Sequence, residues 1–380
     1  MPRLLSVDLI AAARPNFMKI APLYHALKAQ PWCRPRIVHT GQHYDANMSD
    51  AFFDDLQLPK PRVHLNVGSG SHAEQTGRVM IEYEKTCLAS RPDWIVVVGD
   101  VNSTLACALV GAKLLIPVAH LEAGLRSGDR TMPEEINRIV TDSIADLLWT
   151  PSPDGDENLR KEGVPAHKIE QVGNIMLDSF ELLAPKIRAA EGAKKLGLAK
   201  QSYGVVTLHR PSNVDSRDQL DLIVAKLIAI AERLPLVFPV HPRTRQRLQD
   251  FGLVERLHAV PAIRMTEPLS YIEFMSLVVD CRLALTDSGG VQEETSYLGI
   301  PCLTLRENTE RPVTVTHGTN RLVKPATVDE EAERVLARPP RSTCTIPLWD
   351  GRTAGRVVAS LKGRAVVPRE SRGERSSTDH

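Results

Sequence analysis

WIVVVGDVNSTLACALVGAKLLIPVAHLEAGLR, residues 94–126 of the chain, contains two apolar runs separated by a segment with helical character. The runs at 94–98 and 116–120 are short, and each closely precedes a carboxylate, Asp100 or Glu122. Such runs are typical of buried parallel strands, and the segment at 102–114 predicts the helix that connects them. In open α/β sheets ligands bind outside the carboxyl ends of the strands, so the two acids suggest proton chemistry.

A third acid, Glu134, opens a helical pattern at 134–146 directly after Pro133. Three carboxylates would then lie at the carboxyl edge of one sheet. The same pattern has a purely structural interpretation, in which Asp100 caps the helix starting near Asn102 and the acids at 134 and 135 fill a first helical turn. The pattern alone leaves both interpretations open.

Alternating strand-like and helix-like segments on both sides of this stretch predict an α/β fold. We expect strands at 4–12, 36–40, 63–67, 94–98, 116–120, 147–150, 203–208, 236–240 and 283–286. Helices are expected to begin near residues 14, 73, 102, 134, 154, 177, 217, 269 and 289. This order implies parallel sheets covered by helices on both faces. A chain of 380 residues favours two domains, and the lysine-rich segment 186–200 is the best candidate for the hinge.

Composition excludes several classes of partner. The chain has 47 basic and 46 acidic residues and no block of lysine and arginine, so no nucleic-acid partner is expected. No apolar run reaches the ~18 residues of a membrane span, and the amino terminus has no signal-peptide pattern. Six cysteines are scattered without a Cys-x-x-Cys pair, which argues against a disulfide framework or a zinc site. We therefore expect a soluble cytoplasmic protein that binds a small ligand.

Residues 287–294, DSGGVQEE, form the strongest phosphate-binding signal in the chain. Ser288, Gly289 and Gly290 follow an expected strand and open a helix, where backbone N–H groups can approach an anion. Glu294 lies one turn further on, where a carboxylate could accept hydrogen bonds from ribose hydroxyls. A tight turn with nothing bound is the alternative interpretation.

Other polar residues also follow expected strands. Arg14 and Lys19 lie near a helix start after the first strand, which favours a phosphate or diphosphate, although an arginine beside a turn is often a surface residue. His209 and His241 come directly after strands rather than on apolar helix faces. The order of strands and helices therefore predicts a ligand edge in each half of the chain.

Residues 68–73, GSGSHA, formally match the Gly-x-Gly-x-x-Ala fingerprint of dinucleotide-binding proteins. The fingerprint belongs on the first strand of its unit, with an acid at the tip of the next strand. Here it follows a later strand, and Asp100 could only mimic the ribose ligand. We therefore expect no nicotinamide cofactor.

Eight segments together resemble one family, the non-hydrolysing UDP-N-acetylglucosamine 2-epimerases, and the resemblance runs from about residue 5 to 360. The segments are ARPNFMK (13–19), VGDVNST (98–104), HLEAGLRS (120–127), MPEEINR (132–138), TLHR (207–210), VHPRT (240–244), TDSGGVQEE (286–294) and ERP (310–312).

The resemblance implies a GT-B architecture, two Rossmann-like domains whose parallel sheets face a central cleft. The implied domains are 1–173, which carries the carboxylates, and 174–352, which binds UDP. A last helix at about 353–367 would return to the first domain, and 368–380 would be a disordered tail. The resemblance also implies a homodimer that needs neither a nicotinamide cofactor nor a metal.

The family's site residues carry over by position. The implied catalytic residues are Asp100, Glu122, Glu134 and His209. The implied contacts to substrate and UDP are Arg14, Lys19, Arg138, Phe274 against uracil, Glu294 on ribose, and Ser288, Gly289 and Gly290 on phosphate. A possible allosteric site would contain Gln42, His43, His241 and Arg243.

The implied activity is reversible inversion at C2 of UDP-N-acetylglucosamine, which supplies precursors of surface polysaccharides. Many bacterial members read Gly-Gln-His-Arg-Glu where residues 41–45 read GQHYD, which puts activation by substrate in doubt. The segment YDANMS (44–49) resembles the corresponding segment of relatives that act on UDP-2,3-diacetamido-glucuronic acid, so that substrate is an alternative. A hydrolysing epimerase, a GT-B glycosyltransferase and a sugar-nucleotide sensor are the remaining alternatives.

Overall fold

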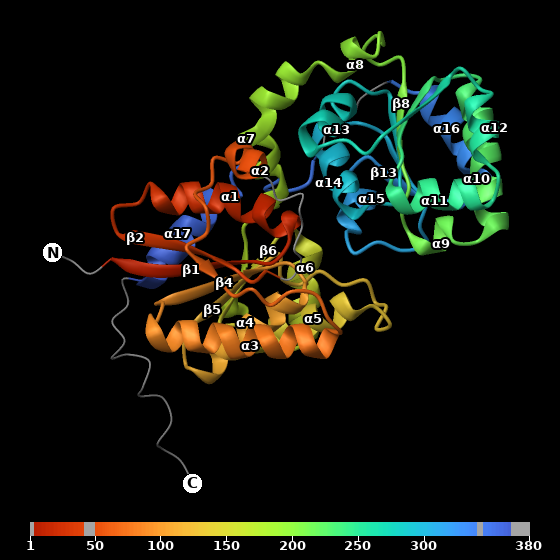
Figure 1. Ribbon diagram of the computed structural model, residues 1–380. Helices are drawn as coiled ribbons and strands as arrows, with labels where there is room; N and C mark the ends of the chain where they lie inside the picture. The colour runs from red at the N-terminus through yellow and green to blue at the C-terminus, as the bar shows by residue number, and fades with distance from the viewer. Residues whose placement is uncertain (1–3, 42–49, 340–344, 366–380) are drawn as a thin grey trace. The chain divides into compact units, whose positions relative to one another are not determined.

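The structure is a computed structural model that describes residues 4–41, 50–339 and 345–365 (Figure 1). The chain divides into two compact units. Unit 1 comprises Met1–Leu125, Asp129–Ser179 and Asp350–His380, and unit 2 comprises Arg126–Gly128 and Phe180–Trp349.

Unit 1 is a parallel sheet of seven strands in the order β3-β2-β1-β4-β5-β6-β7. Its strands are β1 (Leu5–Ala11), β2 (Cys33–His39), β3 (Val63–His64), β4 (Trp94–Val98), β5 (Val118–Leu121), β6 (Leu147–Thr150) and β7 (Ile169–Gln171). Its helices are α1 (Arg14–Lys28), α2 (Asp50–Asp55), α3 (His72–Ala89), α4 (Asn102–Lys113), α5 (Pro133–Ile144), α6 (Pro153–Lys161), the first turn of α7 (Ile175–Ala190) and α17 (Thr353–Ala365), with a 3₁₀ turn at Ala166–Lys168.

Helices cover both faces of this sheet, as expected for parallel strands that are apolar on both sides. Helices α3, α4 and α5 lie side by side below the sheet in Figure 1, and α1 lies beside α17 on the other face. The strand β4 is buried at all five positions. The last helix is anchored at its start, where Asp178 accepts hydrogen bonds from the backbone N–H groups of Thr353 (3.0 Å) and Ala354 (2.8 Å).

Unit 2 is a parallel sheet of six strands in the order β10-β9-β8-β11-β12-β13. Its strands are β8 (Gly204–Thr207), β9 (Leu236–Pro239), β10 (Ile263–Thr266), β11 (Leu283–Thr286), β12 (Cys302–Thr304) and β13 (Asn320–Leu322). Besides most of α7, its helices are α8 (Gly192–Lys195), α9 (Pro211–Val214), α10 (Arg217–Ala231), α11 (Pro242–Asp250), α12 (Val254–His258), α13 (Tyr271–Val278), α14 (Gly289–Leu298), α15 (Val313–Thr316) and α16 (Val328–Leu336), with a 3₁₀ turn at Pro325–Thr327. The core of this unit lies between the sheet and helices α10, α12 and α16.

The two units divide at a different place from the expected domain boundary. The division falls between Ser179 and Phe180, inside α7, whereas 174–352 was expected to form the second domain. The start of α7 belongs to unit 1 because Asp178 holds α17 and the Ser179 hydroxyl donates to the carbonyl of Met18 (2.7 Å). The segment 186–200, expected to be the hinge, lies within unit 2.

Two expected strands have different bounds in the structure. The strand expected at 63–67 is regular only over Val63–His64. The N–H groups of Leu65 and Val67 still donate to the carbonyls of His39 (2.9 Å) and Thr40 (3.1 Å), but Asn66 between them has a left-handed backbone (φ 52°). The strand expected at 116–120 begins at Val118, after Pro117, which has no N–H to donate.

Cys33, Cys87, Cys107, Cys281 and Cys302 are buried. Within the described ranges no helix is long and apolar enough to cross a membrane.

Candidate active site

Both sheets have the strand order of doubly wound folds. In these folds the strands are added on one side of the first strand and then on its other side, so that the strand order reverses there. The reversal lies between β1 and β4 in unit 1 and between β8 and β11 in unit 2. In such folds the ligand crevice lies at the carboxyl ends of these strands. Arg14 and Asp100 follow β1 and β4, and His209 and Ser288 follow β8 and β11, so the sequence motifs fall at the reversal points.

Asp100 is held by a buried cation on α5. The Arg138 guanidinium donates to Asp100 Oδ2 (2.6 Å) through one nitrogen and to Glu135 Oε2 (2.8 Å) through another. The Asn137 side chain donates to the backbone carbonyl of Asp100 (2.8 Å). The N-cap residue of α4 is Val101, whose own side chain makes no capping hydrogen bond. Arg138 therefore links Asp100 to Glu135 on α5.

Glu122 combines a strained backbone with an unsatisfied oxygen. Its φ of 71° lies in the left-handed region, which costs a non-glycine residue about 1–3 kcal/mol. The side chain is 4% exposed. Its Oε2 contacts the Lys19 ammonium, whereas Oε1 has no hydrogen-bond partner among the described residues. Because a buried carboxylate oxygen without a partner is costly, this atom is available for a ligand proton.

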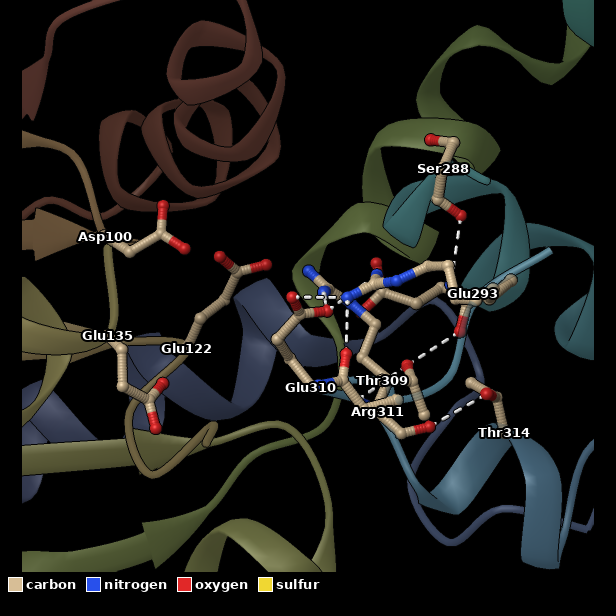
Figure 2. Close-up of polar contacts among 12 residues, drawn as sticks. Asp100, Glu122, Glu135, Ser288, Glu293, Thr309, Glu310, Arg311 and Thr314 are labelled. Atoms are coloured by element: carbon tan, nitrogen blue, oxygen red, sulfur yellow. Dashed lines mark hydrogen bonds and ion pairs between the residues drawn. The ribbon is translucent and has the colours of Figure 1, made fainter. Parts of the chain in front are cut away.

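The loop after β4 must pass close to this carboxylate. Gly99 has φ 71°, and a Cβ at this position would lie 3.3 Å from both Glu122 Oε2 and Lys19 Nζ. Any larger residue would therefore strain the backbone and crowd the ion pair. Figure 2 shows Asp100 and Glu122 extending their carboxylates toward the same side of unit 1.

Glu134 and Glu135 occupy the first turn of α5, as the structural interpretation also expected. Glu134 is half-buried, and its side chain makes no hydrogen bond or ion pair within the described residues. Glu135, which sequence reasoning did not select, is 2% exposed and pairs with Arg138. The i, i+3 spacing of Glu135 and Arg138 was the available signal for this pair.

Unit 2 presents an open helix N-terminus at Ser288, Gly289 and Gly290. Ser288 is the N-cap of α14, but its hydroxyl makes no capping hydrogen bond to the first turn. No atom lies within 4 Å of a Cβ built on Gly290, whereas one built on Gly289 would lie 3.0 Å from Arg311 Nη1. Uncapped N–H groups beside a cation are suited to bind an anion.

Arg311 belongs to the ERP segment, for which no separate role was predicted. Its Nε contacts Glu293 Oε1 (2.5 Å) on α14, and its Nη1 lies 3.7 Å from Glu310 Oε2. Although burial acts to raise the pKa of Glu310, hydrogen bonds from Arg306 (2.8 and 3.0 Å) and nearby positive charge lower it to about 2. Figure 2 shows Arg311 among Glu293, Thr309 and Glu310.

His209 is oriented by a buried carboxylate. Its Nδ1 lies 2.8 Å from Asp287 Oδ1, and its ring remains 39% exposed. Asp287 also accepts from the backbone N–H of Arg210 (2.9 Å) and from Asn213 (3.1 Å). Burial acts to raise the pKa of Asp287, but these hydrogen bonds and His209 bring it below its ordinary value. Asp287 therefore holds His209 with Nε2 as its remaining polar atom.

Glu294 is buried beside an aromatic hydroxyl. The Tyr271 hydroxyl donates to Glu294 Oε1 (2.6 Å), and the carboxyl is 4% exposed. Burial raises the pKa of Glu294 to about 7, with a smaller contribution from the negative charge of Glu293. On the preceding helix, Phe274 is half-buried and packs against Ala284 and Val291.

Replacing Glu294 with glutamine should change how stability depends on pH. The folded state binds this proton more tightly than the unfolded state, whose pKa is 4.5, so the stabilisation is complete below pH 4.5 and is lost as pH rises through about 7. Urea unfolding at pH 4.5, 6, 7 and 8 should show the variant gaining roughly 3 kcal/mol on the wild type across this range. The exposed Glu267→Gln is the control, and a pH-independent difference for Glu294→Gln would contradict the assignment.

The other predicted ligands have identifiable neighbours. Arg14 stacks on Phe52, with 5.2 Å from its guanidinium carbon to the ring centroid. Lys19, expected to meet phosphate, contacts Glu122. His241 is exposed and caps α11 through Arg243 N (3.2 Å), and the Arg243 side chain pairs with Asp215. Gln42 and His43 lie outside the described residues.

The Gly68-x-Gly70 segment follows β3, the edge strand of unit 1, and not the strand beside the reversal point. The helix after it is capped from within the chain. The Ser71 hydroxyl accepts from Glu74 N (3.3 Å), and the Glu74 carboxylate accepts from Ser71 N (2.9 Å). This N-terminus is therefore satisfied without a phosphate.

Two doubly wound units, one with clustered carboxylates and one with an open helix N-terminus, define a protein of the GT-B class with two Rossmann-like domains. The model of the UDP-N-acetylglucosamine 2-epimerase family matches residues 25–362. The chain belongs to this family, as its motifs predicted.

Relatives support the same assignment. The chain is 44% identical over 326 residues to the UDP-N-acetylglucosamine 2-epimerase of Methanocaldococcus jannaschii, covering 84% of this chain and 88% of that protein. It is 43% identical over 318 residues to the UDP-2,3-diacetamido-2,3-dideoxy-D-glucuronate 2-epimerase of Pseudomonas aeruginosa, covering 83% and 87%. A crystal structure of the M. jannaschii enzyme with UDP-GlcNAc and UDP has a TM-score of 0.82 and 41% identity, covering 94% of this chain and all of that one.

Proposed function

We propose that this protein interconverts UDP-N-acetylglucosamine and UDP-N-acetylmannosamine by inverting C2 of the sugar. Membership of the epimerase family supports the reaction class. Within that class, the observation that carries the proposal is Glu122, a buried carboxylate with one unsatisfied oxygen, on the same unit as Asp100.

The reaction needs both proton transfer at C2 and stabilisation of the leaving UDP. The C2 hydrogen is not beside a ketone, so direct removal by a base is too slow. Cleavage of the C1–O bond, with UDP leaving, gives an oxocarbenium-like C1 that acidifies C2. A carboxylate then takes the C2 proton, a second acid returns a proton to the opposite face, and UDP adds back to C1.

The residues of unit 2 match the needs of the leaving group. The open α14 N-terminus at Ser288, Gly289 and Gly290 would stabilise the negative charge of the departing diphosphate. His209, oriented by Asp287, would donate a hydrogen bond to it. Glu294 would accept from ribose hydroxyls, and Phe274 would lie against uracil.

Asp100, Glu122 and Glu134 would share the proton transfers. Lys19 contacts Glu122 and Arg138 contacts Asp100, so each of these carboxylates has a cation beside it. Glu134 is half-buried without a partner in the described residues, so it is accessible to a ligand. The three acids lie in one unit. We propose that they remove and return the proton on the two opposite faces of C2.

The similarity to the P. aeruginosa protein supports a second candidate, C2 epimerisation of UDP-2,3-diacetamido-2,3-dideoxyglucuronate. Both candidates use the same chemistry and differ only in the groups at C3 and C5. Incubation with each UDP-sugar separately, followed by proton NMR of the anomeric signals, should show conversion of UDP-N-acetylglucosamine to a mixture with its C2 epimer. Faster conversion of the diacetamido sugar, with none of UDP-N-acetylglucosamine, would replace the first candidate by the second.

The same spectra separate the other reaction classes. An epimerase keeps UDP joined to the sugar at equilibrium, whereas a hydrolysing enzyme accumulates free UDP and N-acetylmannosamine. A glycosyltransferase would leave the donor unchanged without an acceptor. A homodimeric state and a cytoplasmic location stay predictions.

A further inference from the structure

A second histidine, His120, forms a fully buried pair with Asp142 in unit 1. His120 lies on β5, two residues before Glu122. Asp142 lies on α5, the helix that also carries Arg138. The ring Nδ1 lies 2.6 Å from Asp142 Oδ1, and both side chains are nearly inaccessible, 0% and 1% exposed. The mechanism described above uses neither residue.

Both ring nitrogens of His120 are occupied, which determines where the protons lie. The Nε2 atom lies 2.8 Å from the Gly99 carbonyl, which can only accept, so Nε2 carries a hydrogen. The Nδ1 atom faces a carboxyl oxygen, and two bare acceptors at 2.6 Å would repel each other. A second proton therefore lies between Nδ1 and Asp142, and the pair is neutral as a whole.

The pair contacts the backbone just before Asp100 and shortly after Glu122. Gly99, whose carbonyl accepts from His120, directly precedes Asp100. The other oxygen of Asp142 accepts from the N–H of Gly124 (3.0 Å), two residues after Glu122. Gly124 is held from the other side, because Asn158 donates to its carbonyl (2.9 Å). The left-handed Glu122 thus lies between His120 and Gly124, both of which are fixed.

We propose that His120 and Asp142 are positioning residues that hold the loops carrying Asp100 and Glu122 in register with each other and with α5. The proposal rests on the proposed function, because it assigns these loops a catalytic task. A displacement of about 1 Å in a reacting group can reduce turnover by about 10²-fold. The pair keeps two loops from adjacent strands within that tolerance and touches no substrate.

Two variants separate positioning from folding. In Asp142→Asn the amide nitrogen can donate to a neutral His120 Nδ1, and the amide oxygen can accept from Gly124 N, so the contacts to both loops remain. In the double variant His120→Phe/Asp142→Val both loop contacts are lost, but no buried charge is left unpaired, so the fold is expected to survive. Tyr83→Phe is the matched control, because it removes a buried hydrogen bond to Asp8 (3.0 Å) in the same unit.

We expect Asp142→Asn and Tyr83→Phe to keep kcat within about threefold of wild type. The double variant should lose about 10- to 100-fold in kcat, with KM and UDP affinity changed less than about threefold. Equal kcat values for the double variant and Tyr83→Phe would overturn the proposal. So would a loss in Asp142→Asn as large as that of the double variant.

A measurement that needs no turnover tests the pair itself. In ¹⁵N-labelled protein, His120 Nε2 should carry hydrogen in both the wild type and Asp142→Asn, and a proton shared between Nδ1 and the residue 142 carboxyl should be detected only in the wild type. A wild-type protein without the shared proton would overturn the pair even if the enzyme is active. A shared proton in a protein without epimerase activity would instead overturn the proposed function.

Discussion

Replacing Glu122 with glutamine is expected to lower kcat by a factor of about 10² or more while UDP affinity stays nearly unchanged. Proton transfer by a positioned carboxylate contributes roughly 10²–10⁴-fold, and glutamine cannot take a proton. UDP affinity should persist because the proposed nucleotide contacts lie mainly in unit 2, at Ser288 to Glu294. Initial rates by NMR and UDP titration calorimetry measure the two quantities.

The matched control is Glu82→Gln, an exposed change on α3 that should leave kcat unchanged. Asp100→Asn and Glu134→Gln should behave as Glu122→Gln does if all three acids transfer protons. Because Glu122 pairs with Lys19, a thermal melt is needed for each variant. An equal loss of UDP affinity in the three variants would show that the acids are structural.

Replacing Arg138 with methionine should lower the free energy of unfolding by about 3–5 kcal/mol. The change removes one cation from two carboxylates, Glu135 and Asp100, and Glu135 is almost fully buried, at 2% exposure. Removing one partner of a buried pair is costly because the remaining charge has lost its water. Urea unfolding at pH 7 measures the difference.

Two further variants decide whether the buried charge is the cause. The double variant Arg138→Met/Glu135→Gln should recover part of the lost stability, because it removes the unpaired charge. Arg160→Met breaks a pair in which the arginine is 58% exposed, and it should cost no more than about 1 kcal/mol. If Arg138→Met cost no more than Arg160→Met, or if the double variant recovered no stability, the buried charge of Glu135 would not be the cause.

The strongest parts of the fold could be predicted from local pattern alone. Strands 94–98, 147–150 and 283–286 have the expected bounds, because each is an apolar run with polar residues or turns at its ends. Strands β12 and β13 could not be predicted, since three residues are too few to show a period. The strand order is also invisible in local pattern, because it depends on which strands pair across the chain.

The candidate site, too, could be predicted only in part. Asp100, Glu122 and the Ser288 turn could be predicted because each follows a recognisable strand. Their partners could not, since the contacts join residues far apart in the chain, such as Lys19 with Glu122 and Arg138 with Asp100. The left-handed backbone of Glu122 gave no signal either, because glutamate is not a residue that favours this conformation.

The central claim is that UDP leaves and a carboxylate of unit 1 exchanges the C2 proton before UDP returns. Incubating the protein with UDP-N-acetylglucosamine in D2O and following C2 by proton NMR tests this claim most directly. The account predicts loss of the C2 proton signal from both UDP-N-acetylglucosamine and UDP-N-acetylmannosamine, and no such loss with Glu122→Gln on the same time scale. Formation of the epimer with its C2 protium retained would contradict the account.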